Sequence, residues 1–175
     1  MNNLREESIS TNRLFTGKMI NLRVDEVQLP NGKPATREVI EHPGAVAIVP
    51  ILPDGRIIMV RQFRYPIGDS ILEIPAGKLD GAECPESCAA RELEEETGYI
   101  SEGLTRVTAI WTAPGFTNEI IHIFLADKLV KKKQKLDDDE FLQIEIYTRD
   151  EIRTMIRNGC ICDAKSLVGL YFAGI

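Results

Sequence analysis

The chain has 175 residues, 43% of them hydrophobic and 27% charged, and a formal net charge of −6 at pH 7. That length predicts one domain with a real core, and the acidic balance argues against nucleic acid or a membrane surface as partner. No apolar run approaches the roughly 20 residues of a membrane span. The polar start MNNLREESISTNRLF does not fit a signal peptide.

The first half of the chain favours strands. Segments 17–28 and 34–42 are rich in β-branched and apolar residues, and Pro30-Asn31-Gly32 between them indicates a hairpin turn. The apolar run AVAIVPIL predicts a buried strand at 45–52. Two further strands are expected, at 56–63 and in the segment SILEIPAG, residues 70–77.

The second half mixes helices with strands. The expected helices are 85–97, 149–158 and 163–173, and the expected strands are 103–111, 119–126 and 141–147. The charge run KKKQKLDDDE at 131–140 predicts a solvated loop. This order indicates an α+β sandwich-like fold, not a regular parallel repeat. The four cysteines have no zinc-like spacing, so we expect reduced packing residues and a cytoplasmic protein. Their positions are Cys84, Cys88, Cys160 and Cys162.

The helix at 85–97 carries an unusual charge. Six of the fourteen residues from Glu83 to Glu96 are glutamates, and Arg91 is their one cation. At ~100° per residue, Glu92, Glu95 and Glu96 share one arc of the helix. Like charges at such spacing are destabilising, and the last turn of a helix favours cations. The stripe becomes favourable if Mg²⁺ or Mn²⁺ binds it, although an ordinary solvated acidic helix is the alternative.

The spacing of this segment is more specific than its charge. Gly77, Glu83, Arg91-Glu92-Leu93, Glu95-Glu96 and Gly98 resemble the Nudix box of pyrophosphohydrolases, with Tyr99 as a mild departure. The resemblance implies a Nudix fold, with mixed β-sheets sandwiched by helices (α/β/α) and an N-terminal β region. It implies a divalent metal, Mg²⁺ or alternatively Mn²⁺, and hydrolysis of a diphosphate.

The resemblance also implies roles for single residues. The metal ligands would be Glu92, Glu95, Glu96 and the carbonyl of Ala76. Arg91, with Glu95, would belong to the catalytic machinery. Glu83 and Gly98 would support the box, and Arg91 would help Glu83 to hold the loop and helix together.

Four flanking segments resemble the bacterial ADP-ribose pyrophosphatases. They are ATREVIEHPGAV at 35–46, VRQFRYP at 60–66, LEIPAGKL at 72–79 and TAPGFTNE at 112–119. This implies that the substrate is ADP-ribose and the products are AMP and ribose 5-phosphate. It also implies a homodimer in which an N-terminal region, 1–42, exchanges across a two-fold axis while 43–175 forms the Nudix domain.

Substrate contacts follow from the same resemblance. Arg37 and Arg64 suit phosphate or ribose oxygens, because forked guanidinium donors pair bidentately. A surface charge at Arg37 and an outward-facing strand position at Glu73 are the alternatives. The full set of implied substrate-binding residues is Arg37, Arg64, Glu73, Gly77, Leu79, Pro114, Gly115 and Phe116.

Glu119 is the expected activator of the attacking water, since the subfamily carries a glutamate on this loop; the alternative is a box glutamate. His42 is expected to be structural and Trp111 to lie in the core. Two other functions stay open. One is hydrolysis of a nucleotide sugar or dinucleoside polyphosphate. The other is a non-catalytic ADP-ribose sensor, against which the complete set of box glutamates speaks.

Overall fold

The structure is a computed structural model that describes residues 4–136 and 140–175. It divides into two compact units. The first runs to Gly44 and includes Trp111–Ile120, and the second holds Ala45–Ile110 and Ile121–Ile175. Among the described residues, no helix has both the length and the apolarity needed to span a bilayer.

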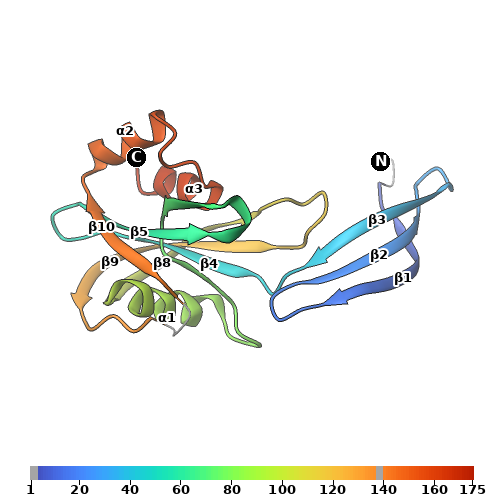
Figure 1. Ribbon diagram of the computed structural model, residues 1–175, viewed down its shortest axis with the longest axis horizontal. Helices are drawn as coiled ribbons and strands as arrows, with labels where there is room; N and C mark the ends of the chain where they lie inside the picture. The colour runs from blue at the N-terminus through green and yellow to red at the C-terminus, as the bar shows by residue number, and fades with distance from the viewer. Residues whose placement is uncertain (1–3, 137–139) are drawn as a thin grey trace. The chain divides into compact units, whose positions relative to one another are not determined.

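The first unit is an antiparallel three-stranded sheet in the order β1-β2-β3 (Figure 1). Its strands are β1 (Glu7–Thr16), β2 (Asn21–Gln28) and β3 (Pro34–Glu41). The predicted hairpin turn is confirmed, with Gly32 at φ 81° donating its N–H to the carbonyl of Leu29 at 2.8 Å. Strand β1 was not predicted. All ten of its residues are exposed, so its sequence lacks the alternation that a buried face imposes.

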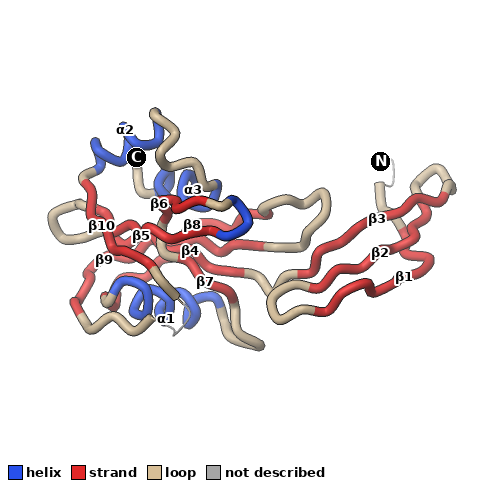
Figure 2. The backbone as a smooth tube through the Cα atoms, in the orientation of Figure 1, coloured by secondary structure: helices blue, strands red, loops and turns tan. Residues whose placement is uncertain are grey.

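The second unit contains two sheets and three α-helices (Figure 2). One sheet has the order β7-β4-β9-β8, in which β4 and β9 are parallel, and the other has the order β10-β5-β6. The strands are β4 (Ala45–Pro50), β5 (Ile57–Arg64), β6 (Asp69–Glu73), β7 (Ala76–Lys78), β8 (Tyr99–Trp111), β9 (Ile120–Lys131) and β10 (Leu142–Tyr147). The helices are α1 (Pro85–Thr97), α2 (Arg149–Arg157) and α3 (Ala164–Phe172), and η1 (Tyr65–Ile67) is a short 3₁₀ turn.

Strand β4 shows how the layers are built. Its alternate side chains enter two different cores, because successive residues of a strand point to opposite faces. Ala47 and Val49 join the cluster that includes residues of α2 and α3. Val46 and Ile48 join the cluster that includes Leu93 of α1. Helices therefore cover both faces of the sheet, and the predicted α/β/α arrangement is confirmed.

The three helices lie where the sequence predicts them, and three other predictions are wrong. The segment 70–77 is not one strand, because β6 and β7 belong to different sheets on either side of Pro75. Trp111 is 58% exposed and not in the core. Among the cysteines, which are all free, Cys88 alone is buried. In the described part of the charge run 131–140, residues 132–136 form the predicted loop and residues 131–133 and 135 are exposed, and the same segment also contacts the end of α1.

Candidate active site

Helix α1 presents its glutamates to the short strand β7. Pro85 occupies the start of the helix, and Gly98 ends it at φ 70°, donating its N–H to the carbonyl of Glu94 at 2.9 Å. Leu93 is fully buried against the sheet. This packing fixes the rotation of the helix, so that Glu92 and Glu96 are buried while Glu95 is partly exposed.

Gly77 lets the helix approach the strand closely. A Cβ atom at this position would lie 1.9 Å from Cδ of Glu92, well inside the distance at which atoms collide. Beside it, the backbone N–H of Ala76 donates to Oε2 of Glu96 at 3.1 Å. The structure thus brings Ala76, Gly77, Glu92 and Glu96 together, as the spacing of the motif predicts.

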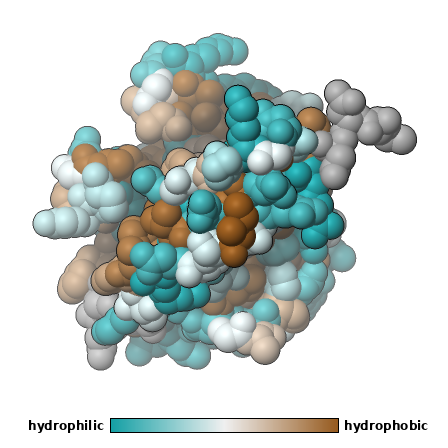
Figure 3. Space-filling view, turned by 90° about the vertical axis from the view of Figure 1, so that its right-hand side faces the viewer, coloured by the Kyte–Doolittle hydropathy of each residue, from teal (hydrophilic) through white to brown (hydrophobic). Residues whose placement is uncertain are grey.

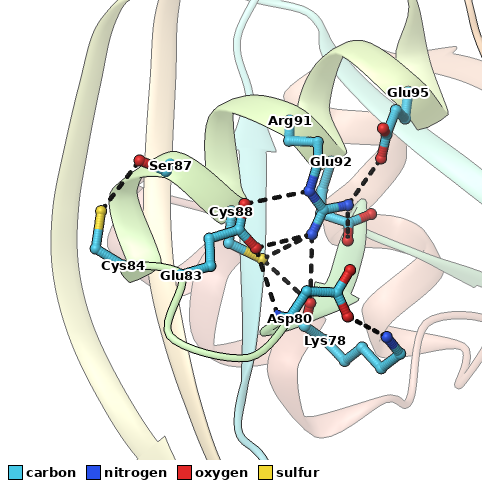
Figure 4. A network of polar contacts seen from close by, with 9 residues as sticks. All are labelled: Lys78, Asp80, Glu83, Cys84, Ser87, Cys88, Arg91, Glu92 and Glu95. Atoms are coloured by element: carbon cyan, nitrogen blue, oxygen red, sulfur yellow. Dashed lines mark hydrogen bonds and ion pairs between the residues drawn. The ribbon is translucent and has the colours of Figure 1, made fainter.

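Arg91 lies at the centre of the polar network (Figure 4). Its Nη1 donates to Oε1 of Glu92 and to Oε2 of Glu95, both at 2.8 Å. Its Nη2 donates to Glu83 at 3.0 Å, and its Nε donates to the same carboxylate at 3.2 Å. Glu83 precedes the helix, so this bidentate pair ties the loop to α1. The hydrogen bonds from Arg91 hold the pKa of Glu83 below its ordinary value.

Two box carboxylates are in an unfavourable electrostatic position. Burial raises the pKa of Glu92 to about 7 despite the attraction of Arg91, and the charges of Glu95 and Glu140 act in the same direction as burial. Burial and the charge of Glu92 raise the pKa of Glu96 to about 8, with further contributions from Glu140 and Glu73. Both groups would ionise more readily beside additional positive charge.

The segment after β9 contacts the C-terminal end of the same helix, α1. Lys135 pairs with Glu94 at 3.2 Å, and its N–H donates to the carbonyl of Glu95. The side chain of Gln134 donates to the carbonyl of Glu96 at 2.5 Å. These contacts satisfy carbonyl groups at the C-terminal end of α1, where the helix itself has no basic residue.

Glu140 is a residue that the sequence analysis missed. The sequence predicts a solvated loop at this position, yet the charge of Glu140 contributes to the raised pKa values of both Glu92 and Glu96. No local pattern marks it, since its neighbourhood reads as an ordinary acidic run. Only the folded chain brings it near the box.

The donor set fits a divalent cation held by oxygen. Glu92 and Glu96 are buried carboxylates with raised pKa values. Glu92 lies closer to the backbone of Gly77 than any other residue type at position 77 would permit, and Glu96 accepts the N–H of Ala76. Within residues 4–136 and 140–175, no three acidic, histidine or cysteine side chains are already gathered around one point. Instead, Arg91 lies between the carboxylates of Glu92 and Glu95. A cation would be held by Glu92, Glu95 and Glu96 with the carbonyl of Ala76.

Arg64 and Glu73, two of the predicted substrate residues, contact each other. Nε of Arg64 donates to Oε1 of Glu73 at 2.7 Å. Glu73 is 1% exposed, so the alternative of an outward-facing strand residue is wrong. Leu79 is partly buried against the apolar cluster under α1.

The remaining predicted residues lie in the first unit. Arg37 pairs with Glu6 at 2.6 Å. Pro114, Gly115 and Phe116 are exposed in the segment 111–120, and the carbonyl of Phe116 accepts the N–H of Ile40 at 2.8 Å.

Glu119 accepts a hydrogen bond from Thr112 at 2.7 Å. Its Oε1 lies 3.6 Å from Nδ1 of His42, which itself accepts the N–H of Gly44. That nitrogen is therefore an acceptor, and the contact with Glu119 is not a hydrogen bond.

Comparison with known proteins agrees with this geometry. The family model described as the NUDIX domain matches residues 41–165 of the sequence. The chain therefore belongs to the Nudix family. The model of the nucleoside diphosphate sugar hydrolase N-terminal domain matches residues 6–40.

Individual relatives and one solved structure are also similar. The ADP-ribose pyrophosphatase of Bacillus subtilis is 45% identical over 98% of this chain and 94% of its own length. The methanol dehydrogenase activator of Bacillus methanolicus is 44% identical over 95% of this chain and 91% of its own. The crystal structure of an ADP compounds hydrolase superposes with a TM-score of 0.84 at 21% identity, covering 95% of this chain and 91% of that one, and supports the fold.

Proposed function

We propose that the protein hydrolyses the diphosphate of ADP-ribose to AMP and ribose 5-phosphate with the help of Mg²⁺. The observation that carries this is the pair of buried carboxylates Glu92 and Glu96, set against β7 in a Nudix box. The choice of ADP-ribose rests on the relative that is 45% identical over nearly the whole chain. Water adds to one phosphorus, the bridging P–O bond breaks, and the released proton passes to a base.

The bound metal would neutralise phosphate charge, acidify water and steady the leaving group. The chain's own residues do the rest. Arg91 holds Glu83, Glu92 and Glu95 in one arrangement. Arg64 uses Nε for Glu73, which leaves its terminal nitrogens out of that bond and suited to a phosphate oxygen pair. We propose contacts to the rest of the substrate from Arg37, Leu79, Pro114, Gly115 and Phe116.

The experiment is a substrate panel. The purified protein with Mg²⁺ is given ADP-ribose, ADP-glucose, GDP-mannose and diadenosine polyphosphates, and kcat/KM is measured for each. We expect ADP-ribose to be preferred by about tenfold or more. Equal rates would remove the substrate assignment and leave a general pyrophosphohydrolase. Binding of ADP-ribose without turnover would instead support the sensor. Hydrolysis in heavy-oxygen water would show which product takes up the solvent oxygen.

We further propose that the protein is a homodimer whose N-terminal strands exchange across a two-fold axis. The first unit exposes large apolar side chains, which a lone three-stranded sheet cannot bury. These residues are Ile9, Leu14, Phe15 and Met19. Figure 3 shows apolar patches among hydrophilic side chains on the face that it displays. The free cysteines favour a reducing cytoplasmic location.

A further inference from the structure

Glu73 is a buried carboxylate held by cations from two different elements. Arg64 of β5 contacts Oε1 at 2.7 Å, and Nζ of Lys165 in the first turn of α3 donates to Oε2. Glu73 is 1% exposed and Lys165 is 9% exposed. A lysine this deeply buried is unusual, and the proposed hydrolysis gives it no task.

Lys165 is itself fixed from the other side. Its Nζ lies 3.0 Å from Oδ2 of Asp163, the residue that caps α3. The same Asp163 oxygen accepts the backbone N–H of Ser166 at 3.0 Å, and Oγ of Ser166 accepts the N–H of Ile74 at 2.9 Å. Ile74 follows Glu73 in the chain, so the start of α3 is tied directly to the end of β6.

The charges of this group explain what Lys165 contributes. A lone Glu73 would neutralise most of the positive charge of Arg64, because the two are in contact and little water intervenes. Lys165 shares that carboxylate and is itself paired with Asp163 at 3.0 Å, so the four side chains together carry no net charge. What Lys165 adds is a second anchor for the carboxylate of Glu73. Burial acts to lower the pKa of Arg64, but its bond to Glu73 and the charges of Glu73, Glu96 and Asp163 outweigh burial, and Arg64 remains charged.

We propose that Lys165 is a positioning residue for the substrate diphosphate. By holding Glu73, it fixes the guanidinium of Arg64 in the position from which it meets an anionic ligand. This inference rests on the proposed function, since it assumes that Arg64 meets the diphosphate. Lys165 itself touches no substrate.

The first test replaces Lys165 by methionine, which keeps much of the side-chain length and removes the charge. We expect KM for ADP-ribose to rise about tenfold while kcat changes less than about twofold, because the lost interaction acts on bound substrate and transition state alike. Arg61→Met is the matched control. Arg61 lies on the same strand and pairs with Glu145 at 2.5 Å, so its loss should lower thermal stability and leave KM unchanged.

A double-mutant cycle separates positioning from mere structural support. In a Glu73→Gln background, Lys165→Met should change KM less than about twofold, because the carboxylate through which Lys165 acts is gone. A similar rise of KM in both backgrounds would show that Lys165 acts independently of Glu73, and an unchanged KM in the single variant would equally overturn the proposal. If Lys165→Met does not fold, Lys165→Gln provides the same comparison while keeping a hydrogen-bond donor.

Failure of this inference is distinguishable from failure of the proposed function. Wild-type protein that hydrolyses ADP-ribose, with a Lys165→Met variant of normal KM, refutes the role of Lys165 alone. Wild-type protein that prefers another diphosphate refutes the substrate assignment. The double-mutant cycle of Lys165 and Glu73 is then carried out by measuring KM for that other substrate.

Discussion

Two glutamates outside the box compete for the task of activating water. Glu119 is the sequence-based prediction, and its carboxylate accepts a hydrogen bond from Thr112. Glu140 is the candidate that the folded chain adds, since its charge acts on Glu92 and Glu96. A general base must lie within reach of the attacking water, so the two candidates are best compared directly by substitution.

Glu119→Gln and Glu140→Gln, measured in parallel, decide between them. The variant that removes the base should lose about 10²–10⁴-fold in kcat while Mg²⁺ binding, followed by calorimetry, stays nearly intact. Glutamine keeps the shape of the side chain and removes its ability to accept a proton. Unchanged turnover in Glu119→Gln would refute the prediction made from the sequence. Unchanged turnover in both variants would return the role to a box glutamate.

At the scale of the element, the acidic stripe of α1 gives stability a defined pH dependence. Glu92 and Glu96 have folded-state pKa values of about 7 and about 8, above the ordinary value of 4.5. The folded protein therefore binds more protons than the unfolded chain between these limits. Stability from these groups is fully present below about pH 4.5 and is lost as the pH rises through 7 to 8.

The melting temperature of chelator-treated protein should consequently decrease as the pH is raised from about 5.5 to about 8.5. Added Mg²⁺ should raise the melting temperature more at pH 8.5 than at pH 6, because it binds the ionised carboxylates. Calorimetric scans at both pH values, with and without Mg²⁺, check this. Equal metal-induced shifts at the two values would contradict the electrostatic account of α1.

The end of α1 offers a second test at this scale. Gly98 has φ 70°, and a Cβ there would lie 2.9 Å from the backbone nitrogen of Gln134. Gly81 has φ 56° with nothing within 4 Å, so it isolates the conformational cost. Urea unfolding should show a loss of about 1 kcal/mol for Gly81→Ala and about 2–3 kcal/mol for Gly98→Ala. Equal losses in the free energy of unfolding would mean that the backbone at Gln134 moves away from the added methyl group at no cost.

What the sequence could predict differs between elements for physical reasons. Helix α1 is predicted with its observed bounds, because Pro85, Gly98 and the buried Leu93 are local signals that agree with one another. Strand β1 is missed since none of its residues is buried. The box glutamates follow from spacing along one helix. Glu140 and Lys165 do not, because their roles depend on contacts between segments far apart in the chain.

At the scale of the whole molecule, the exposed apolar residues of the first unit predict self-association. Sedimentation equilibrium should give twice the 19.6 kDa chain mass. Ile9→Glu combined with Leu14→Glu should shift the protein towards the single-chain mass, because charged side chains would have to be buried in the interface. A single-chain mass for the wild-type protein at micromolar concentration would overturn the proposed exchange of strands.

The guanidinium of Arg91 contacts Glu83, Glu92 and Glu95, and this arrangement bears on the stability of the metal-free protein. In the metal-free protein the single positive charge of Arg91 reduces the repulsion between these three carboxylates. Removal of Mg²⁺ by a chelator should therefore abolish activity without unfolding the protein, and re-addition of Mg²⁺ should restore turnover within the mixing time.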